Sequence, residues 1–216
     1  MTPSMISLFC FEFAEKMMQD NDPSHDLEHA NRVHKLARYL AGKEGADLDI
    51  VIPASIGHDL IVYPKDSLKS KLSATHSAAE VAKFLQGIDD FPRDKIVAVM
   101  YAIQVCSFSK GIVPTTLEAK ILQDADLLEA VGAVAIMRTF ASAGSMNKTF
   151  YSPEDPFCVY REPDAHKYAL DLFYTRLLQV EKRLHTQTAR ELARPRTKFL
   201  HQFLTQLTLE LPQTNK

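Results

Sequence analysis

Apolar residues recur every three or four positions along most of the chain, which is the period of one face of an α-helix. The first such stretch covers residues 5–19. Residues 48–60 are apolar on most sides, so we expect a buried helix there. The same period predicts further helices over 74–87, over 92–106, from 115–118 onwards, over 164–180 and over 186–210. The pattern predicts an all-α protein.

The second helix has clear start and stop signals. Asp22-Pro23-Ser24 is a typical helix start, and Gly45 is a typical stop. Its predicted inner stripe is His29, Val33, Leu36 and Leu40, with spacings of 4, 3 and 4. This stripe contains a histidine among aliphatic residues.

Three stretches break the helical pattern. Residues 61–72 form a loop that carries Lys65, Lys69 and Lys71, and residues 107–114 form a second loop. Thr115-Thr116-Leu117-Glu118 then has the form of a capping box at a helix start. Residues 144–163 hold three prolines and predict a long irregular segment of the kind that often serves as a lid.

Composition narrows the class of protein. The 216 residues are 46% hydrophobic and 24% charged, which is ordinary for a globular chain and excludes disorder and collagen. Only 7 residues are glycine. Walker and Rossmann nucleotide sites need glycine-rich loops, so the scarcity of glycine disfavours both. The chain has no apolar run of the roughly 18 residues that span a bilayer and no basic leader, so a membrane is not an expected partner.

Charge and cysteine content point to the compartment and the partners. The formal net charge is −2, whereas proteins that bind duplex nucleic acid usually carry a basic surplus, so nucleic acid is not an expected partner. Cys10, Cys106 and Cys158 are odd in number and widely spaced. A disulfide framework is therefore not expected, and a reducing, cytoplasmic location fits best.

Four residues combine into a candidate metal site. His29 lies on the apolar stripe of its helix, His58-Asp59 ends the buried helix, and Asp126 lies in a segment that is apolar on both faces. A buried carboxylate is normally paired or bound to a metal, because an isolated one is costly. Two imidazoles and two carboxylates form a mixed set that suits Mn, Fe, Co, Ni or Zn.

Each of these residues also has an ordinary structural interpretation. A single histidine on an apolar face is more often a hydrogen-bonded core residue than a ligand. A buried aspartate more often caps a helix or pairs with an arginine, here Arg32 or Arg38. The spacings match no zinc-ribbon or HExxH pattern, so the residues alone leave both interpretations open.

The order of the motifs resembles that of the HD-domain metal-dependent phosphohydrolases, in particular the small single-domain bacterial group. It runs from His25 through His29, then His58-Asp59, then Asp124-Ala125-Asp126, and the likeness covers about residues 20–205. The resemblance implies one domain over residues 1–216. Its fold would be an all-α bundle around a metal, with the helix over 5–19 and the C-terminal helices packed on it.

The resemblance also implies a function. His29, His58, Asp59 and Asp126 would hold one divalent ion (Mn, Co, Ni, Fe, Mg or Zn). The activity would be metal-dependent hydrolysis at phosphorus in a small molecule, in particular a nucleotide, as a (d)NTP pyrophosphohydrolase or a phosphatase. A homodimer stays open.

Roles for individual residues follow from the hydrolysis hypothesis. Asp59 would accept a proton from the attacking water, and His25, one turn from His29, would orient a ligand or protonate the leaving group. Substrate phosphate would be held by Lys65, Lys69, Lys71, His76 and Arg138. The structural alternatives are a solvated lysine loop, a surface His25, and an Arg138 that pairs with Glu118 or Glu129.

One position departs from the family pattern. Related sequences commonly carry a histidine directly before Ser-Phe-Ser, where this chain has Cys106. A thiol cannot replace an imidazole without changing metal preference, so we expect one metal rather than two. Cys106 could equally be a core residue at a helix end. The departure keeps an alternative function open: a metal-containing domain that senses a nucleotide with little or no turnover.

Overall fold

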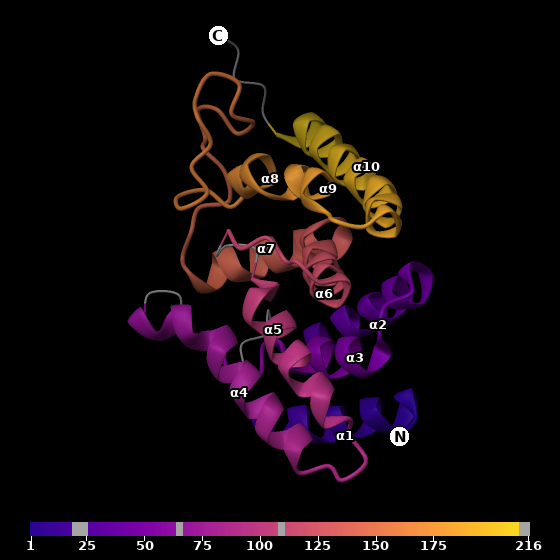
Figure 1. Cartoon of the computed structure of the whole chain (residues 1–216). Helices are drawn as coiled ribbons and strands as arrows, with labels where there is room; N and C mark the ends of the chain where they lie inside the picture. Colours follow the sequence, from indigo (N-terminus) through magenta and orange to yellow (C-terminus); the bar gives the residue numbers. More distant parts are fainter. Residues whose placement is uncertain (19–25, 64–66, 108–110, 212–216) are drawn as a thin grey trace. The chain divides into compact units, whose positions relative to one another are not determined.

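The computed structural model describes residues 1–18, 26–63, 67–107 and 111–211 (Figure 1). Within these ranges regular structure is helical, with one isolated bridge between Thr149 and Tyr168 and no strand, which confirms the all-α prediction. In chain order the elements are α1 (Pro3–Met17), α2 (Leu27–Glu44), α3 (Leu48–Gly57), η1 (Leu68–Leu72), α4 (Ser73–Gln86), η2 (Arg93–Lys95), α5 (Ile96–Cys106), α6 (Leu117–Leu127), η4 (Leu128–Ala130), α7 (Ala133–Ser145), α8 (Asp171–Thr175), η5 (Leu177–Gln179), α9 (Val180–Arg183) and α10 (Gln187–Glu210).

The chain divides into two compact units, Met1–Asp126 and Leu127–Lys216. In Figure 1 the first unit begins with the indigo helix α1, and the second ends with the yellow helix α10. All four predicted metal ligands belong to the first unit. The assignment of the whole chain to one domain is not decided by this division and stays a prediction.

Helix α2 ends where the sequence predicts, and its first described turn is capped by Asp26; the predicted start signal Asp22-Pro23-Ser24 lies outside the described residues. The Asp26 carboxylate accepts a hydrogen bond from the His29 N–H at 2.8 Å, and Gly45 ends the helix with a φ of 77°, a left-handed conformation that favours glycine. His29, Val33 and Leu40 are buried as expected. Leu36 is only half-buried, however, and His34 and Ala37 lie on the buried side as well. The buried face is therefore wider than the predicted stripe.

Helix α3 is the centre of the first unit. Its residues 51–57 are all buried, as predicted, and it packs against α1, α2, α4 and α5. The helix ends at Gly57, directly before the His58-Asp59 pair. A Cβ on Gly57 would lie 2.3 Å from Cγ2 of Val81 on α4. The missing side chain therefore allows α3 and α4 to approach closely at the point where the two predicted ligands follow the helix.

Helix α6 starts at the predicted place but with a different cap. The Thr116 hydroxyl, not that of Thr115, accepts from the N–H three residues later, at 3.3 Å. The Thr115 hydroxyl instead contacts the Tyr101 hydroxyl at 2.8 Å. The Glu118 carboxylate accepts from the backbone N–H of Asp47 at 3.2 Å. The capping box is therefore wrong, because tertiary partners use two of its side chains.

The prediction of one helix over 164–180 is wrong. Regular structure begins only at α8 and is broken again before η5 and α9. The N–H groups of Ala169 and Leu170 donate to the carbonyls of Thr149 and Phe150, at 3.0 and 2.8 Å. A continuous helix would need those donors for its own carbonyls. The irregular segment over 144–163 and the helix over 186–210, capped by Thr186, are confirmed.

Among the described residues, no single helix is long and apolar enough to cross a membrane. Residues 117–145 pass that test of length and composition only as a bent pair of helices.

Candidate metal centre

Four side chains from three parts of the first unit converge on one point. The Nε2 atoms of His29 and His58 lie 3.3 Å apart. Oδ2 of Asp59 lies 3.8 Å from Nε2 of His29 and 3.6 Å from Nε2 of His58. Oδ1 of Asp126 lies 3.6 Å from Nε2 of His29. The structure thus brings together all four residues that the sequence singled out.

The ends of helices position these side chains. His29 lies in the first turn of α2, fixed by the Asp26 cap. His58 and Asp59 directly follow α3, and Asp126 lies in the last turn of α6. Side chains at helix ends can point along the helix axis into a shared space, so residues distant in sequence meet there.

The tautomer of His58 suits metal binding. Its Nδ1 lies 2.8 Å from the carbonyl oxygen of Ser55. A carbonyl can only accept, so Nδ1 carries the proton and donates it. In the neutral ring, Nε2 then presents a lone pair toward His29 and Asp59. Hydrogen bonds of this kind orient most metal-binding histidines in proteins.

The spacing of the donor atoms also fits a shared cation. Nitrogens bound to one metal at about 2.1 Å are about 3.0–3.4 Å apart in octahedral or tetrahedral geometry. The two imidazoles meet that condition, and one donor atom each from His29, His58 and Asp126 lie within 4.8 Å of one another. Two nitrogens with two carboxylates suit a divalent ion of the first transition series.

The centre is buried on the imidazole side and more open on the carboxylate side. His29 is 0% exposed and His58 is 3% exposed, whereas both aspartate side chains are 26% exposed. Water and a small substrate can therefore reach the carboxylates. The imidazoles, by contrast, lie in the core.

Cys106 is affected by the charges of the two carboxylates of the centre. It is buried at the end of α5, and burial raises the pKa of its thiol well above the usual value. The charges of Asp126 and Asp59 raise this pKa further. The residue is therefore a neutral thiol beside the carboxylates, in agreement with the expectation of a core position at a helix end.

The other predicted residues have different positions. His25 and Lys65 lie outside the described residues. Lys69 and Lys71 are exposed on η1, and His76 is half-buried on α4 with its Nδ1 2.9 Å from the Tyr63 hydroxyl. Arg138 is half-buried on α7, in the second unit. Their contacts with a substrate stay a prediction.

Sequence reasoning missed two polar residues behind the centre. His34 on α2 and Ser55 on α3 are both buried, and His34 Nδ1 lies 3.1 Å from the Ser55 hydroxyl. One signal was available, since His34 and Ser55 are polar residues in otherwise apolar helix faces.

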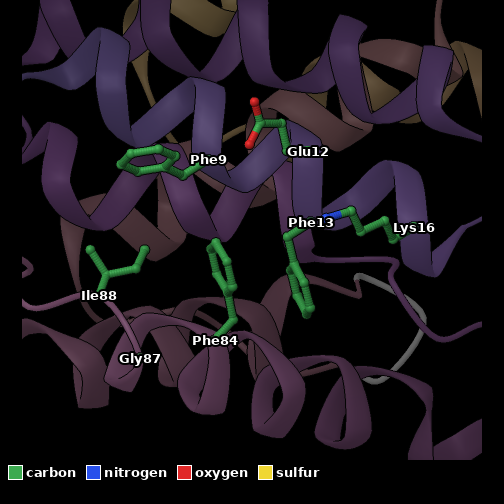
Figure 2. Close-up of a pocket in the computed structure, with 7 residues that line it drawn as sticks. All are labelled: Phe9, Glu12, Phe13, Lys16, Phe84, Gly87 and Ile88. Atoms are coloured by element: carbon green, nitrogen blue, oxygen red, sulfur yellow. The ribbon is translucent and has the colours of Figure 1, made fainter.

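A groove of about 340 Å³ lies apart from these residues, between α1 and the end of α4. Figure 2 shows Phe13 and Phe84 side by side in it, and their rings stack at 4.3 Å between centroids. The complete lining is Phe9, Glu12, Phe13, Lys16, Phe84, Gly87 and Ile88. None of the four converging residues lines this groove.

Comparison with known proteins identifies relatives over nearly the whole chain. Residues 26–131 match the model of the HD domain. The uncharacterized protein YpgQ of Bacillus subtilis is 33% identical over 202 residues, which cover 93% of this chain and 91% of YpgQ. Residues 26–131, which match the HD-domain model, contain all four converging residues.

Solved structures give the same result. The crystal structure of B. subtilis YpgQ in complex with ADP has a TM-score of 0.76 and 31% identity, over 99% of this chain and 98% of that one. Lin1889 of Listeria innocua has a TM-score of 0.76 and 27% identity over the whole of both chains. An HD-superfamily hydrolase of Bacillus thuringiensis has a TM-score of 0.72 and 26% identity, over 97% and 98%.

Proposed function

Because the chain belongs to the HD-domain family, we propose that it is a metal-dependent phosphohydrolase acting on a small phosphorylated molecule, specifically a nucleotide. The convergence of two imidazole nitrogens and two carboxylates carries this proposal. The cytoplasmic location and the homodimer stay predictions.

In this proposal His29, His58, Asp59 and Asp126 hold one divalent cation. When bound, such a cation lowers the pKa of water and polarises a phosphoryl oxygen. The fixed tautomer of His58 and the 3.3 Å between the imidazole nitrogens support this ligand set. The nitrogen and oxygen donors suit Mn, Co, Ni, Fe or Zn. Mg is included only because the family resemblance implies it.

Asp59 is the residue that we propose takes the proton from the attacking water. Its Oδ2 faces both imidazoles, and its side chain is 26% exposed, so water can reach the carboxylate. We assign the proton to Oδ1. His25 would donate a proton to the leaving oxygen, because it lies four residues before His29 in the sequence.

Phosphate binding is assigned to the cations of the loop after the HD pair. Lys69 and Lys71 are exposed on η1 and can reach an anion in solvent. Lys65, His76 and Arg138 complete the proposed set. The ADP complex of the B. subtilis relative supports a nucleotide as the ligand class.

The test is an activity screen with matched variants. Protein reconstituted with Mn²⁺, Co²⁺, Ni²⁺ or Mg²⁺ is incubated with nucleoside mono-, di- and triphosphates and with cyclic nucleotides. Release of pyrophosphate from a triphosphate identifies cleavage between the α and β phosphates, whereas release of orthophosphate identifies a phosphatase. Asp59→Ala should abolish release, and Asp90→Ala, at an exposed turn, should not.

A second candidate function is supported by Cys106. A neutral thiol beside the carboxylates, in place of the family's histidine, favours a domain that binds metal and nucleotide with little or no turnover. ADP binding measured by calorimetry, together with no product from any substrate and metal, would select this sensor and overturn the hydrolase.

A further inference from the structure

A buried hydrogen bond joins α2 to α3 behind the metal centre. His34 is 5% exposed and Ser55 is 0% exposed. Nδ1 of His34 lies 3.1 Å from Oγ of Ser55, and Nε2 of His34 lies 3.4 Å from Oγ of Ser7 on α1. One imidazole therefore contacts serines on two other helices.

The direction of this hydrogen bond follows from the remaining partners. The Ser55 hydroxyl has one proton, which it donates to the Ile52 carbonyl at 2.9 Å. Oγ of Ser55 must then accept from Nδ1–H of His34. Burial, with the charges of Arg38 and Lys35, lowers the pKa of His34 to about 4, so the ring is neutral at pH 7. A neutral ring with its proton on Nδ1 matches this arrangement.

Ser55 links the hydrogen bond to the metal centre. Its hydroxyl oxygen accepts a hydrogen bond from Nδ1–H of His34, and its backbone carbonyl accepts one from Nδ1–H of His58 at 2.8 Å. His29 and His34 both lie on the buried side of α2, and His58 follows Ser55 by one turn. The same two helices therefore meet through His34 and Ser55 and again through the two ligand imidazoles.

We propose that His34 and Ser55 are positioning residues for the metal centre: their hydrogen bond fixes α2 against α3, and so sets the separation of the His29 and His58 nitrogens. This inference rests on the proposed metal ligands. Apolar contacts between helices are not directional, so they allow small shifts along the interface. A buried hydrogen bond resists such shifts, because breaking it leaves a polar group without a partner.

The test measures Mn²⁺ affinity of metal-free full-length protein by calorimetry. Ser55→Ala removes the acceptor for His34 but keeps the backbone carbonyl that orients His58. We expect its Mn²⁺ affinity to fall about tenfold, the low end of the range for residues that support metal ligands. His34→Leu should have the same effect. His34→Asn places an amide N–H near the position of Nδ1–H and should recover most of the affinity.

Ser7→Ala is the matched control. It removes the partner on the other side of the same imidazole, which lies on α1, and leaves the bond to α3 intact. Its Mn²⁺ affinity should stay within twofold of the wild type, although urea unfolding should show a similar loss of stability for both serine variants. The visible absorption of bound Co²⁺ should change in Ser55→Ala and not in Ser7→Ala.

Three results would overturn the inference. Wild-type affinity in Ser55→Ala would remove the positioning role and leave the proposed hydrolase intact. Equal losses in Ser55→Ala and Ser7→Ala would identify a general loosening of the core. A wild-type protein that binds no Mn²⁺, Co²⁺ or Ni²⁺ would overturn the ligand set and this inference together. If Ser55→Ala does not fold, Ser55→Cys, which is closer in volume and a poor acceptor, replaces it in each comparison.

Discussion

Asp171 in the second unit and the pair of Asp59 and Asp126 in the first unit are carboxylates in contrasting surroundings. Asp171 is 0% exposed, and it accepts from Nη2 of Arg161 at 2.8 Å and from the backbone N–H of Asp164 at 2.7 Å. Asp59 and Asp126 are 26% exposed; Oδ2 of Asp59 lies 3.8 Å from Nε2 of His29 and 3.6 Å from Nε2 of His58, and Oδ1 of Asp126 lies 3.6 Å from Nε2 of His29.

The two arrangements have different consequences. Burial alone would raise the pKa of Asp171, but the Arg161 guanidinium and the Asp164 N–H outweigh it and hold the pKa below the usual value. The Asp171 carboxylate is therefore already paired with a cation of the same chain, the Arg161 guanidinium. At the metal centre the facing groups are imidazoles, which can donate lone pairs to an added cation. A fixed internal partner indicates a structural role, whereas converging lone pairs and carboxylates indicate a binding site.

The largest expected effect comes from removing the internal cation of the second unit. Arg161→Met leaves the Asp171 carboxylate buried without its guanidinium, and should lower the free energy of unfolding by about 3 kcal/mol. Urea denaturation measures this loss. The double variant with Asp171→Asn should recover part of it, because no charge is then buried. Stability equal to the wild type would contradict a structural role for the pair.

The next effect is the loss of a proposed ligand. His58→Ala should weaken Mn²⁺ binding by at least about 100-fold, or about 2.7 kcal/mol, because it removes one of the two imidazole donors. Calorimetry and elemental analysis measure it, with His201→Ala on the exposed face of α10 as the control. Arg161→Met should leave Mn²⁺ affinity unchanged. Unchanged Mn²⁺ affinity in His58→Ala together with weakened affinity in Arg161→Met would contradict this assignment, because it would place the metal near Arg161.

The two units should lose stability at different pH values as the solution is acidified. The pKa of His34 falls from its usual 6.5 to about 4 on folding, so the unfolded chain binds a proton first. The stability from its neutral form is complete above pH 6.5 and is lost as pH falls to about 4, by about 3 kcal/mol. Asp171 has a lowered pKa, so its contribution persists until the pH falls below 3.8.

The measurement for this pH dependence is urea unfolding of metal-free protein between pH 7 and pH 4. Wild-type stability should fall across that window, and the slope for His34→Leu should be shallower. Parallel slopes for the two proteins would assign the acid sensitivity to other groups.

The smallest effect concerns the start of the helix that carries Asp126. Thr116→Ala removes the observed cap of α6 and should cost about 1 kcal/mol in thermal unfolding. Mn²⁺ affinity should change little, since Asp126 lies in the last turn of that helix. A larger loss of stability in Thr115→Ala would favour the capping box expected from the sequence.

The sequence predicted the elements whose ends are set by local interactions. Gly45, the predicted stop, ends α2 through its left-handed backbone conformation, and Thr186 begins α10 through a hydrogen bond to an N–H three residues later. The four converging residues were also predictable, because polar side chains in apolar helices need partners. Their order, matched to a known family, favours a ligand role over a structural one, and that role stays a proposal.

The features that were missed depend on distant partners. Residues 164–170 have a helical pattern, but the N–H groups of Ala169 and Leu170 donate to the carbonyls of Thr149 and Phe150, far away in sequence. His34 resembles an ordinary core histidine until Ser55 is placed opposite it. Local periodicity carries no information on which helix faces which, so neither feature follows from spacing.

Gly57 has a consequence for how this protein can vary. Gly45 is required by its backbone conformation, and a side chain there would meet open space, whereas Gly57 is helical and is required by volume alone. Adding one methyl group at Gly57 would push against Val81 and displace His58 and Asp59 together. A substitution there could be accommodated by a smaller residue at position 81, so the two positions should change as a pair among functional variants, although neither is a proposed metal ligand.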